Sequence, residues 1–280
     1  MAFCLHRGEN FRQGLFRCVL EQLHAALLEL LNPGRMPSRK LVHKTRQRLK
    51  KCRALLRMTD KTQARECNIL LREAGRSLSY TRDMQVALLT LQRLIRDMED
   101  GRGLVTTFRK RLTHRIVTFQ DIANPSENTA HLIRAAIAKM SRLSAANTDA
   151  DNPGERLTSL YHLARKARAA WRKSRDTAAL HEVRKCSKDL LYALAFARNH
   201  CSTKAHRFAA RLEQFAKITG LLLDLDVLLR VAATFHESVP ALVSLQVDAM
   251  RRQLGRQVTE SAHKLFDVKP GVFTRKITLG

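Results

Sequence analysis

Apolar residues recur along this chain at steps of three and four, which is the period of one face of an α-helix. No alternation of apolar and polar residues is long enough to predict a β-strand. The sequence has only six prolines and eleven glycines, and most of them mark breaks between periodic segments. The pattern therefore predicts an all-α protein. We expect helices near residues 9–31, 39–58, 61–79, 82–99, 103–122, 127–145, 155–174, 177–200, 204–220, 222–236 and 240–266.

Three stretches carry cationic side chains at one repeated helical spacing. Positions i, i+3, i+7, i+10 and i+14 lie along one face of a helix, so each set forms a stripe. Neighbouring cations repel one another, and a stripe of them is costly unless an anion lies against it. The stripes are His43, Arg46, Lys50, Arg53 and Arg57; Arg165, Arg168, Arg172 and Arg175; and His181, Arg184 and Lys188, with Leu191 in place of a fourth cation.

The two stripes that begin with histidine lie beside a mostly apolar seam. Each seam residue comes one position before a stripe residue, which is a rotation of about 100° on a helix. Such a helix packs its seam into a bundle while its cations line a groove alongside. An ordinary solvated face offsets its cations with nearby acids, whereas residues 39–58 hold nine Lys or Arg and no acid. The seams are Val42, Thr45, Leu49, Cys52 and Leu56, and Leu180, Val183, Ser187, Leu190 and Leu194.

The sequence around the two histidine stripes indicates a duplication. His43 is followed by Arg82-Asp83, and His181 is followed by Asp224 after a similar length of chain. We expect each cationic helix to turn back into a second helix that opens near its Asp. Two four-helix-bundle-like halves, residues 1–146 and 147–280, would then be related by a pseudo-twofold axis, with both cationic edges facing one basic central groove.

Composition changes the picture mainly through charge. Lys and Arg total 51 against 25 Asp and Glu, a formal net charge of +26 that is spread over both halves. Such a charge favours an acidic polymer or an anionic membrane surface as partner. The most hydrophobic window, residues 218–233, is too short and too charged to span a bilayer. Six cysteines without a C-x-x-C pair indicate reduced thiols, and the N-terminus shows no apolar signal segment, so we expect a cytoplasmic protein without membrane contact.

The motifs around the stripes resemble those of the conserved-histidine α-helical domain family, CHAD. The first CHAD signature is similar to Val42-His43-x-x-Arg46-x-x-x-Lys50-Lys51-x-Arg53, and the second to Leu180-His181-x-x-Arg184-Lys185-x-x-Lys188 with Tyr192. Further matches are Trp171-Arg172-Lys173-Ser174-Arg175, Arg82-Asp83, Gly220-x-x-x-Asp224 and the segment 262–270. The resemblance covers residues 9–277 and identifies 1–280 as a single CHAD-like domain.

This resemblance implies two four-helix bundles around a basic channel that binds inorganic polyphosphate, in a family not known for catalysis. Asp189 and Leu191 stand where basic residues are commoner, which predicts a weaker second-half site unless Arg165 and Arg168 compensate. The Glu-x-Glu-x-Lys motif of the triphosphate hydrolases joined to some members does not occur here. Together with the stripes, the predicted polyphosphate-binding residues are His43, Arg46, Lys50, Lys51, Arg53, Arg57, Arg82, Arg165, Arg168, Arg172, Arg175, His181, Arg184, Lys185 and Lys188.

The chemistry of polyphosphate fits these residue types. Polyphosphate has no base to stack, and aromatic residues make up only 5% of the chain. Arg binds phosphate oxygens with both arms of its guanidinium, and Lys adds a point charge. We therefore predict a cytoplasmic, non-enzymatic polyphosphate-binding protein that is targeted to polyphosphate granules, with no cofactor and no metal. The alternatives are sequence-independent nucleic-acid binding, which the charge favours at low salt, and an enzyme that acts on polyphosphate or nucleoside triphosphates.

The motif histidines and aspartates admit other roles. No Ser/His/Asp or Cys/His pattern accompanies His43 or His181, and no His, Cys or Asp lies three or four residues after either one. We interpret both as structural or phosphate-binding histidines, whose protonation raises affinity below about pH 6.5. Asp83 and Asp224 are interpreted as N-terminal helix residues that pair with motif arginines. Trp171 is interpreted as a core anchor beside the groove, and the sequence specifies neither a catalytic residue nor an oligomeric state.

Overall fold

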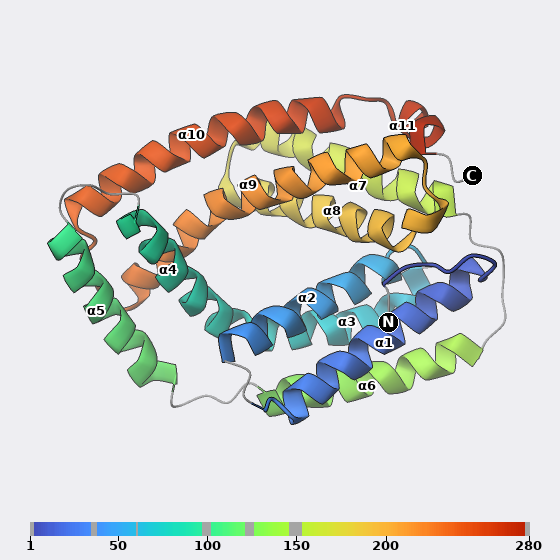
Figure 1. Cartoon of the computed structure of the whole chain (residues 1–280), viewed down its shortest axis with the longest axis horizontal. Coiled ribbons are helices and arrows are strands. Elements are labelled where there is room, and N and C mark those ends of the chain that lie inside the picture. Colours follow the sequence, from blue (N-terminus) through green and yellow to red (C-terminus); the bar gives the residue numbers. More distant parts are fainter. Residues whose placement is uncertain are drawn as a thin grey trace.

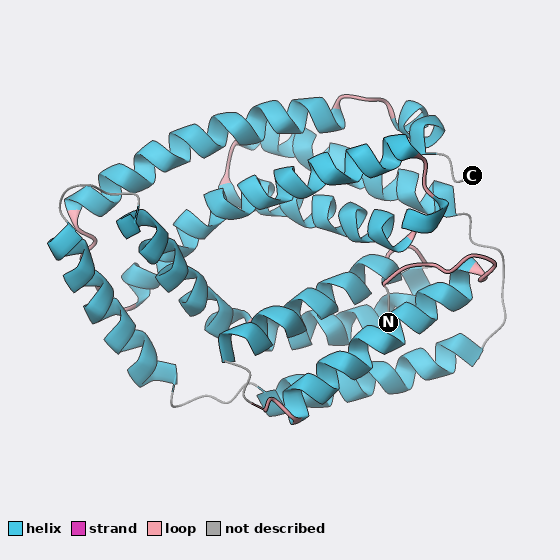
Figure 2. Ribbon diagram, in the orientation of Figure 1, coloured by secondary structure: helices cyan, strands magenta, loops and turns pink. Residues whose placement is uncertain are grey.

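Helices account for nearly all of the computed structural model, which describes residues 3–34, 38–59, 61–96, 102–120, 126–145 and 153–277. Within these residues the chain forms eleven α-helices, one short 3-10 helix and no strand (Figures 1 and 2), which confirms the predicted all-α fold. None of the helices in this part of the chain is long and apolar enough to cross a membrane. In chain order the elements are α1 (Phe11–Leu31), α2 (Ser38–Leu56), α3 (Lys61–Ser77), α4 (Ser79–Arg96), α5 (Arg102–Gln120), α6 (Ser126–Ala145), α7 (Pro153–Ser174), α8 (Thr177–Phe196), η1 (Arg198–His200), α9 (Thr203–Thr234), α10 (Ala241–Phe266) and α11 (Pro270–Ile277).

Helix α9 is longer than the sequence predicts. The predicted break near residue 221 is wrong, because α9 runs without interruption through Gly220. Glycine lowers helix propensity, but the buried neighbours Thr219 and Leu223 hold this segment against the rest of the protein. The missing side chain also leaves room for Arg184, whose nearest nitrogen lies 3.0 Å from the point that a Cβ would occupy.

Two further differences lie near helix ends. Helix α8 ends at Phe196 rather than near residue 200, and η1 follows it. Helix α11 was not predicted, because its eight residues are too few for a clear hydrophobic period. A helix this short is marginal in water and depends on packing. That packing is aromatic, since the Phe273 ring stacks on Tyr161 with centroids 4.0 Å apart.

The helices gather around two hydrophobic cores. The larger core joins a bundle of α1, α2, α3 and α6 to α7, α8, α11, the first part of α9 and the last part of α10 (Figure 1). Its fully buried side chains include Leu15, Leu49 and Phe215. The smaller core lies where α4 and α5 pack against the second part of α9 and the first part of α10, with Phe108 and Leu228 fully buried.

The order of helix packing is similar along the two halves of the chain. Helix α1 packs on α2, α2 on α3 and α3 on α6, while α7 packs on α8, α8 on α9 and α9 on α10. Helices α2 and α8 also pack on each other, and α4 packs on α9. The predicted boundary between 1–146 and 147–280 lies outside the described residues. This arrangement brings the two helices with histidine stripes side by side.

Tyr161→Phe tests how the end of α10 is held. The Tyr161 side chain is buried, and its hydroxyl lies 3.2 Å from the Leu265 carbonyl and 2.8 Å from the Val268 carbonyl. Without the hydroxyl a carbonyl loses its partner, so we expect the free energy of unfolding to fall by about 1–3 kcal/mol in urea denaturation. Tyr192→Phe, which leaves these two carbonyls untouched, is the matched control. Equal unfolding midpoints for the two variants would contradict this role.

Candidate anion-binding groove

A groove of about 360 Å³ lies between α2 and α8, where α4 and α9 pack beside them. Among the described residues that line it, nine are Arg, Lys or His and four are acids. The cationic edges of α2 and α8 therefore face one shared hollow. The lining cations are Arg46, Lys50, Arg53 and Arg57 from α2, Arg82 from α4, and His181, Arg184, Lys185 and Lys188 from α8.

Burial along α2 and α8 follows the predicted seams and sets the direction of the cations. Burying an apolar seam fixes the rotation of a helix about its axis. Seven residues that each follow a seam position line the groove as a result: Arg46, Lys50, Arg53, Arg57, His181, Arg184 and Lys188. Every seam residue is buried, namely Val42, Thr45, Leu49, Cys52 and Leu56 in α2, and Leu180, Val183, Ser187, Leu190 and Leu194 in α8. The shape of the groove is thus a consequence of the hydrophobic pattern.

Burial and mutual repulsion make the charged forms of the basic side chains in the groove less favourable. Burial and the nearby Arg184, Arg46 and Lys188 lower the pKa of Lys50 to about 7, from an ordinary value of 10.5. Keeping these side chains protonated in the empty groove therefore costs free energy. A bound anion lowers that cost. Burial is also the first cause of the lowered pKa of five further groove cations: Arg46, Arg53, Arg82, Arg184 and Lys188.

The two signature histidines lie close to these cations. His181 lines the groove, and His43 is near enough for Arg82 and Lys50 to act on it. Burial, followed by neighbouring cations, lowers the pKa of both imidazoles. Both rings are therefore neutral near pH 7 in the empty protein. A neutral imidazole donates one hydrogen bond to a phosphate oxygen, and it gains a second donor when an anion favours its protonation.

Acidic side chains offset part of the charge in the groove. Asp189 is only 8% exposed, and its Oδ2 lies 3.2 Å from Nε of Arg57. Burial raises the pKa of Asp189 to about 6, against the opposing effect of Arg57. Asp224 lies near Arg184 and Arg82, and burial raises the pKa of its carboxyl as well. Asp189 of the second half thus offsets a cation of the first half, and among the described residues only Arg57 and Lys185 of the groove cations form an ion pair with an acid.

Helices α3 and α9 position three of the groove arginines. Arg46 donates from Nη1 to the Gly75 carbonyl, and Arg53 donates from Nε to Oδ1 of Asn68 at 2.9 Å. Each contact uses one arm of the guanidinium and leaves the others for a ligand. Arg184 instead lies against the backbone of α9 at Gly220, and its buried Nε makes no hydrogen bond.

The second stripe, on α7, does not line the groove. Arg165 donates from Nε to the Phe266 carbonyl at 2.8 Å, and Arg168 pairs with Asp267 at 2.7 Å. These contacts hold the C-terminal end of α10, where cations are favourable. The geometry therefore contradicts the expectation that Arg165 and Arg168 compensate for the second-half site. The physical reason is that α7 turns this face toward α10 and α11, and not toward α2.

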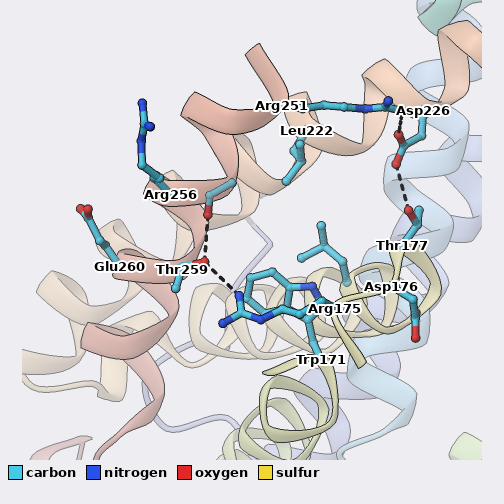
Figure 3. Close-up of a pocket in the computed structure, with 12 residues that line it drawn as sticks. Trp171, Arg175, Asp176, Thr177, Leu222, Asp226, Arg251, Arg256, Thr259 and Glu260 are labelled. Carbon is cyan, nitrogen blue, oxygen red and sulfur yellow. Dashed lines mark hydrogen bonds and ion pairs between the residues drawn. The ribbon is translucent and has the colours of Figure 1, made fainter. Parts of the chain in front are cut away.

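Three more of the predicted residues also lie elsewhere. Arg175, with φ of 55°, places its guanidinium 5.0 Å from the Trp171 ring centroid and donates to Thr259 at 3.3 Å (Figure 3). Both belong to a separate pocket of about 740 Å³ between α7, α8, α9 and α10, so Trp171 is a core residue beside that pocket. Arg172 is exposed on α7. Lys51 lies over a Phe ring of the N-terminal segment, 4.7 Å from its centroid.

Asp83 and Asp224 both line the groove. Asp83 is the fifth residue of α4, so this helix opens near it as predicted, whereas Asp224 lies in the middle of α9, so the helix-opening prediction is wrong there. Asp83 pairs with Arg230 at 3.4 Å rather than with a signature arginine. The cationic spacing does not predict the apolar wall that α4 and α9 supply, which includes Val86 and Leu223. The signal for it was present in the helical period of the apolar residues in these two segments.

The CHAD domain family model matches residues 19–233, which include every residue that lines the groove. The chain belongs to the CHAD domain family. A crystal structure of the CHAD domain from the plant Ricinus communis is similar to this CHAD domain with a TM-score of 0.62 and 17% sequence identity. The match covers 100% of this chain and 98% of that chain, which shows a common fold. A search of curated proteins finds no match.

Gly220→Ala is expected to weaken ligand binding in the groove without destabilising the fold. The added methyl would lie 3.0 Å from Nη2 and 3.3 Å from Nε of Arg184, so the guanidinium has to shift. Alanine favours the helix by about 0.8–1 kcal/mol. We expect stability in urea to be kept or raised, while the affinity for long-chain polyphosphate falls at least about threefold, a loss near 0.7 kcal/mol.

The matched control for this variant is Gly255→Ala. Gly255 also lies inside a helix, and a Cβ there meets nothing within 4 Å. Gly255→Ala therefore gives the same gain in helix propensity and leaves the groove unchanged. Equal polyphosphate affinities for the two variants would show that the position of Arg184 is unimportant for binding.

Proposed function

We propose that this CHAD domain binds inorganic polyphosphate along the groove between α2 and α8 without converting it. The observation that supports this proposal is the convergence of eight Arg and Lys side chains, together with His181, from α2, α4 and α8 on one hollow. Single exposed ion pairs contribute only about 0–1 kcal/mol each. A chain with a negative charge on every phosphate contacts many of the cations at once, and a half-buried groove strengthens each contact.

The lining of the groove favours polyphosphate over nucleic acid. No aromatic residue is among the described residues that line it, and single-stranded nucleic acid binds most strongly where bases stack on aromatic faces. The net charge of +26 still attracts DNA and RNA at low salt, whatever their sequence. We therefore infer that nucleic acid is a weaker, non-specific competitor for this surface.

The described lining of the groove offers few groups that assist phosphoryl chemistry. None of these residues is a Ser, Thr or Cys nucleophile, and the acids lie beside arginines or, for Glu182, beside Lys185. No three His, Cys, Asp or Glu side chains in the described part of the chain gather as a metal site. Binding without catalysis is the function that these side chains support. We propose that it concentrates the protein on polyphosphate granules in the cytoplasm.

The joint substitution Arg46→Glu, Lys50→Glu and Arg53→Glu tests the groove directly. It replaces three cations of α2 that line the hollow, so isothermal titration with long-chain polyphosphate should show at least about tenfold weaker binding. For wild type we expect the affinity to fall steeply with salt, with a log–log slope near −6 if about eight phosphates are contacted. Circular dichroism should show a folded variant, because fewer like charges remain in the groove.

The control has the same change of charge outside the groove. Lys110, Lys166 and Lys217 are exposed on α5, α7 and α9, and none lines the groove. Their joint replacement by Glu should change affinity by no more than about twofold at physiological salt, where charges are screened beyond about 8 Å. Equal losses in both triple variants would remove the groove from the site. Single-stranded DNA that displaces polyphosphate at equal phosphate concentration would favour nucleic-acid binding instead.

Lys50 is expected to couple binding to proton uptake. Its pKa is about 7 in the empty groove, so at pH 8 the amine is mostly neutral. Bound phosphate raises this pKa, and binding at pH 8 should therefore take up close to one proton. Affinity should accordingly fall as the pH rises above about 7. Titration in buffers of different ionisation enthalpy measures the uptake, which Lys50→Arg should largely abolish and Lys188→Arg should preserve. Uptake that persists in Lys50→Arg would contradict this assignment.

A further inference from the structure

A fourth cationic stripe, on α9, lies outside the groove. Lys204, Arg207 and Arg211 repeat the i, i+3, i+7 spacing, and Lys264 of α10 joins them around a pocket of about 340 Å³. All four side chains are exposed. No acid is among the described residues that line this pocket, and none of the four cations forms an ion pair within the described part of the chain. Their charge is therefore uncompensated.

The floor of this pocket is apolar. It consists of Tyr161, Phe208, Leu265, Val268 and Phe273, contributed by α7, α9, α10, α11 and the link between the last two. The Phe208 ring meets Tyr161 and Phe273 edge to face, with centroids 6.0 and 5.1 Å apart. The Tyr161 hydroxyl is already bonded to the carbonyls of Leu265 and Val268. The floor thus offers apolar surface and no free polar group among these side chains.

This combination distinguishes the pocket from the groove. The groove joins cations to acids and small aliphatic residues, whereas the α9 pocket joins cations to aromatic rings without acids. Polyphosphate gains nothing from an aromatic floor. A nucleobase needs an exposed ring face to stack on, whereas Tyr161 and Phe273 are buried and stacked on each other. A ligand that uses both parts of the pocket has a compact anionic group and an apolar body.

We propose that the α9 pocket binds a small amphiphilic anion, in which a carboxylate, sulfonate or phosphate is joined to an aromatic or aliphatic body. The anionic group lies among Lys204, Arg207, Arg211 and Lys264, and the body covers Phe208 and Val268. The volume is at the lower end of the range of about 300–1,000 Å³ for small-molecule sites. The α9 pocket shares no described lining residue with the groove, so this activity is separate from polyphosphate binding.

The test uses 8-anilinonaphthalene-1-sulfonate, an aromatic sulfonate whose fluorescence rises in apolar surroundings. We expect saturable binding to the folded wild-type chain and about tenfold weaker binding to the double variant Arg207→Gln, Arg211→Gln, which loses two anion contacts. The matched control is Arg252→Gln with Arg256→Gln, an exposed pair at the same spacing on α10. The control should bind the probe within about twofold of wild type. Equal losses in the two double variants would overturn the proposal.

Competition identifies the chemistry of the ligand. Dodecyl phosphate below its micelle concentration should displace the probe, whereas inorganic phosphate and adenosine monophosphate at the same concentration should not. Displacement by inorganic phosphate would show an anion site that does not use an apolar body, and displacement by the nucleotide would show a nucleotide site. Binding to phosphatidylglycerol vesicles without binding to dodecyl phosphate would show a membrane surface. Each of these three results would overturn the proposal.

Two further measurements keep the test decisive. Phe208→Ala removes part of the apolar floor and should weaken binding of the probe, and an unchanged affinity in a folded variant would overturn the proposal. If Phe208→Ala unfolds, the proposal is tested by Arg207→Gln, Arg211→Gln alone, because that double variant alters only exposed side chains. Polyphosphate titration of Arg207→Gln, Arg211→Gln should match wild type, which separates a failure of the α9 pocket from a failure of the groove.

Discussion

The structure depends on holding like charges side by side in a half-buried groove. Cations on α2 and α8 face one another because the apolar seams of both helices are buried one residue away. Burial of apolar surface stabilises by about 25 cal/mol per Å², so the two hydrophobic cores oppose the repulsion. The lowered pKa of Lys50 is the thermodynamic sign of that repulsion, since the folded protein binds its proton less tightly than the unfolded chain does. Stability and anion affinity therefore oppose each other in these two helices.

The acids in the groove moderate this opposition without removing it. Asp189 is buried beside Arg57, and such a pair costs desolvation while it fixes the geometry of the arginine. Asp224 acts on Arg184 and Arg82 from the opposite wall. A groove of cations alone would carry the full repulsion, and one with matched acids would not need an anion. On the proposed function, this intermediate balance lets the protein fold empty and still gain free energy when a polyanion binds.

The parts of the fold that depend on one helix at a time were predictable from the sequence. The period of apolar residues placed the helices, and the seams of α2 and α8 gave the face that holds Arg46, Lys50 and Arg184. Features that depend on a neighbouring helix were not predictable in this way. The break expected after Gly220 is absent because Thr219 and Leu223 are buried against other helices and hold this segment. Helix α11 is held in place because the Phe273 ring stacks on Tyr161, which lies more than a hundred residues earlier in the chain.

One spacing of cations serves three purposes in this chain, which shows what a stripe does and does not encode. On α2 and α8 it lines a groove, on α7 it holds the end of α10, and on α9 it surrounds an aromatic floor. The i, i+3, i+7 pattern fixes only that the charges share one helix face. What lies opposite that face decides whether the cations meet a second row of cations, a set of carbonyls or an apolar surface. The function of each stripe is therefore a property of a pair of helices, and it becomes readable only when the packing partner is known.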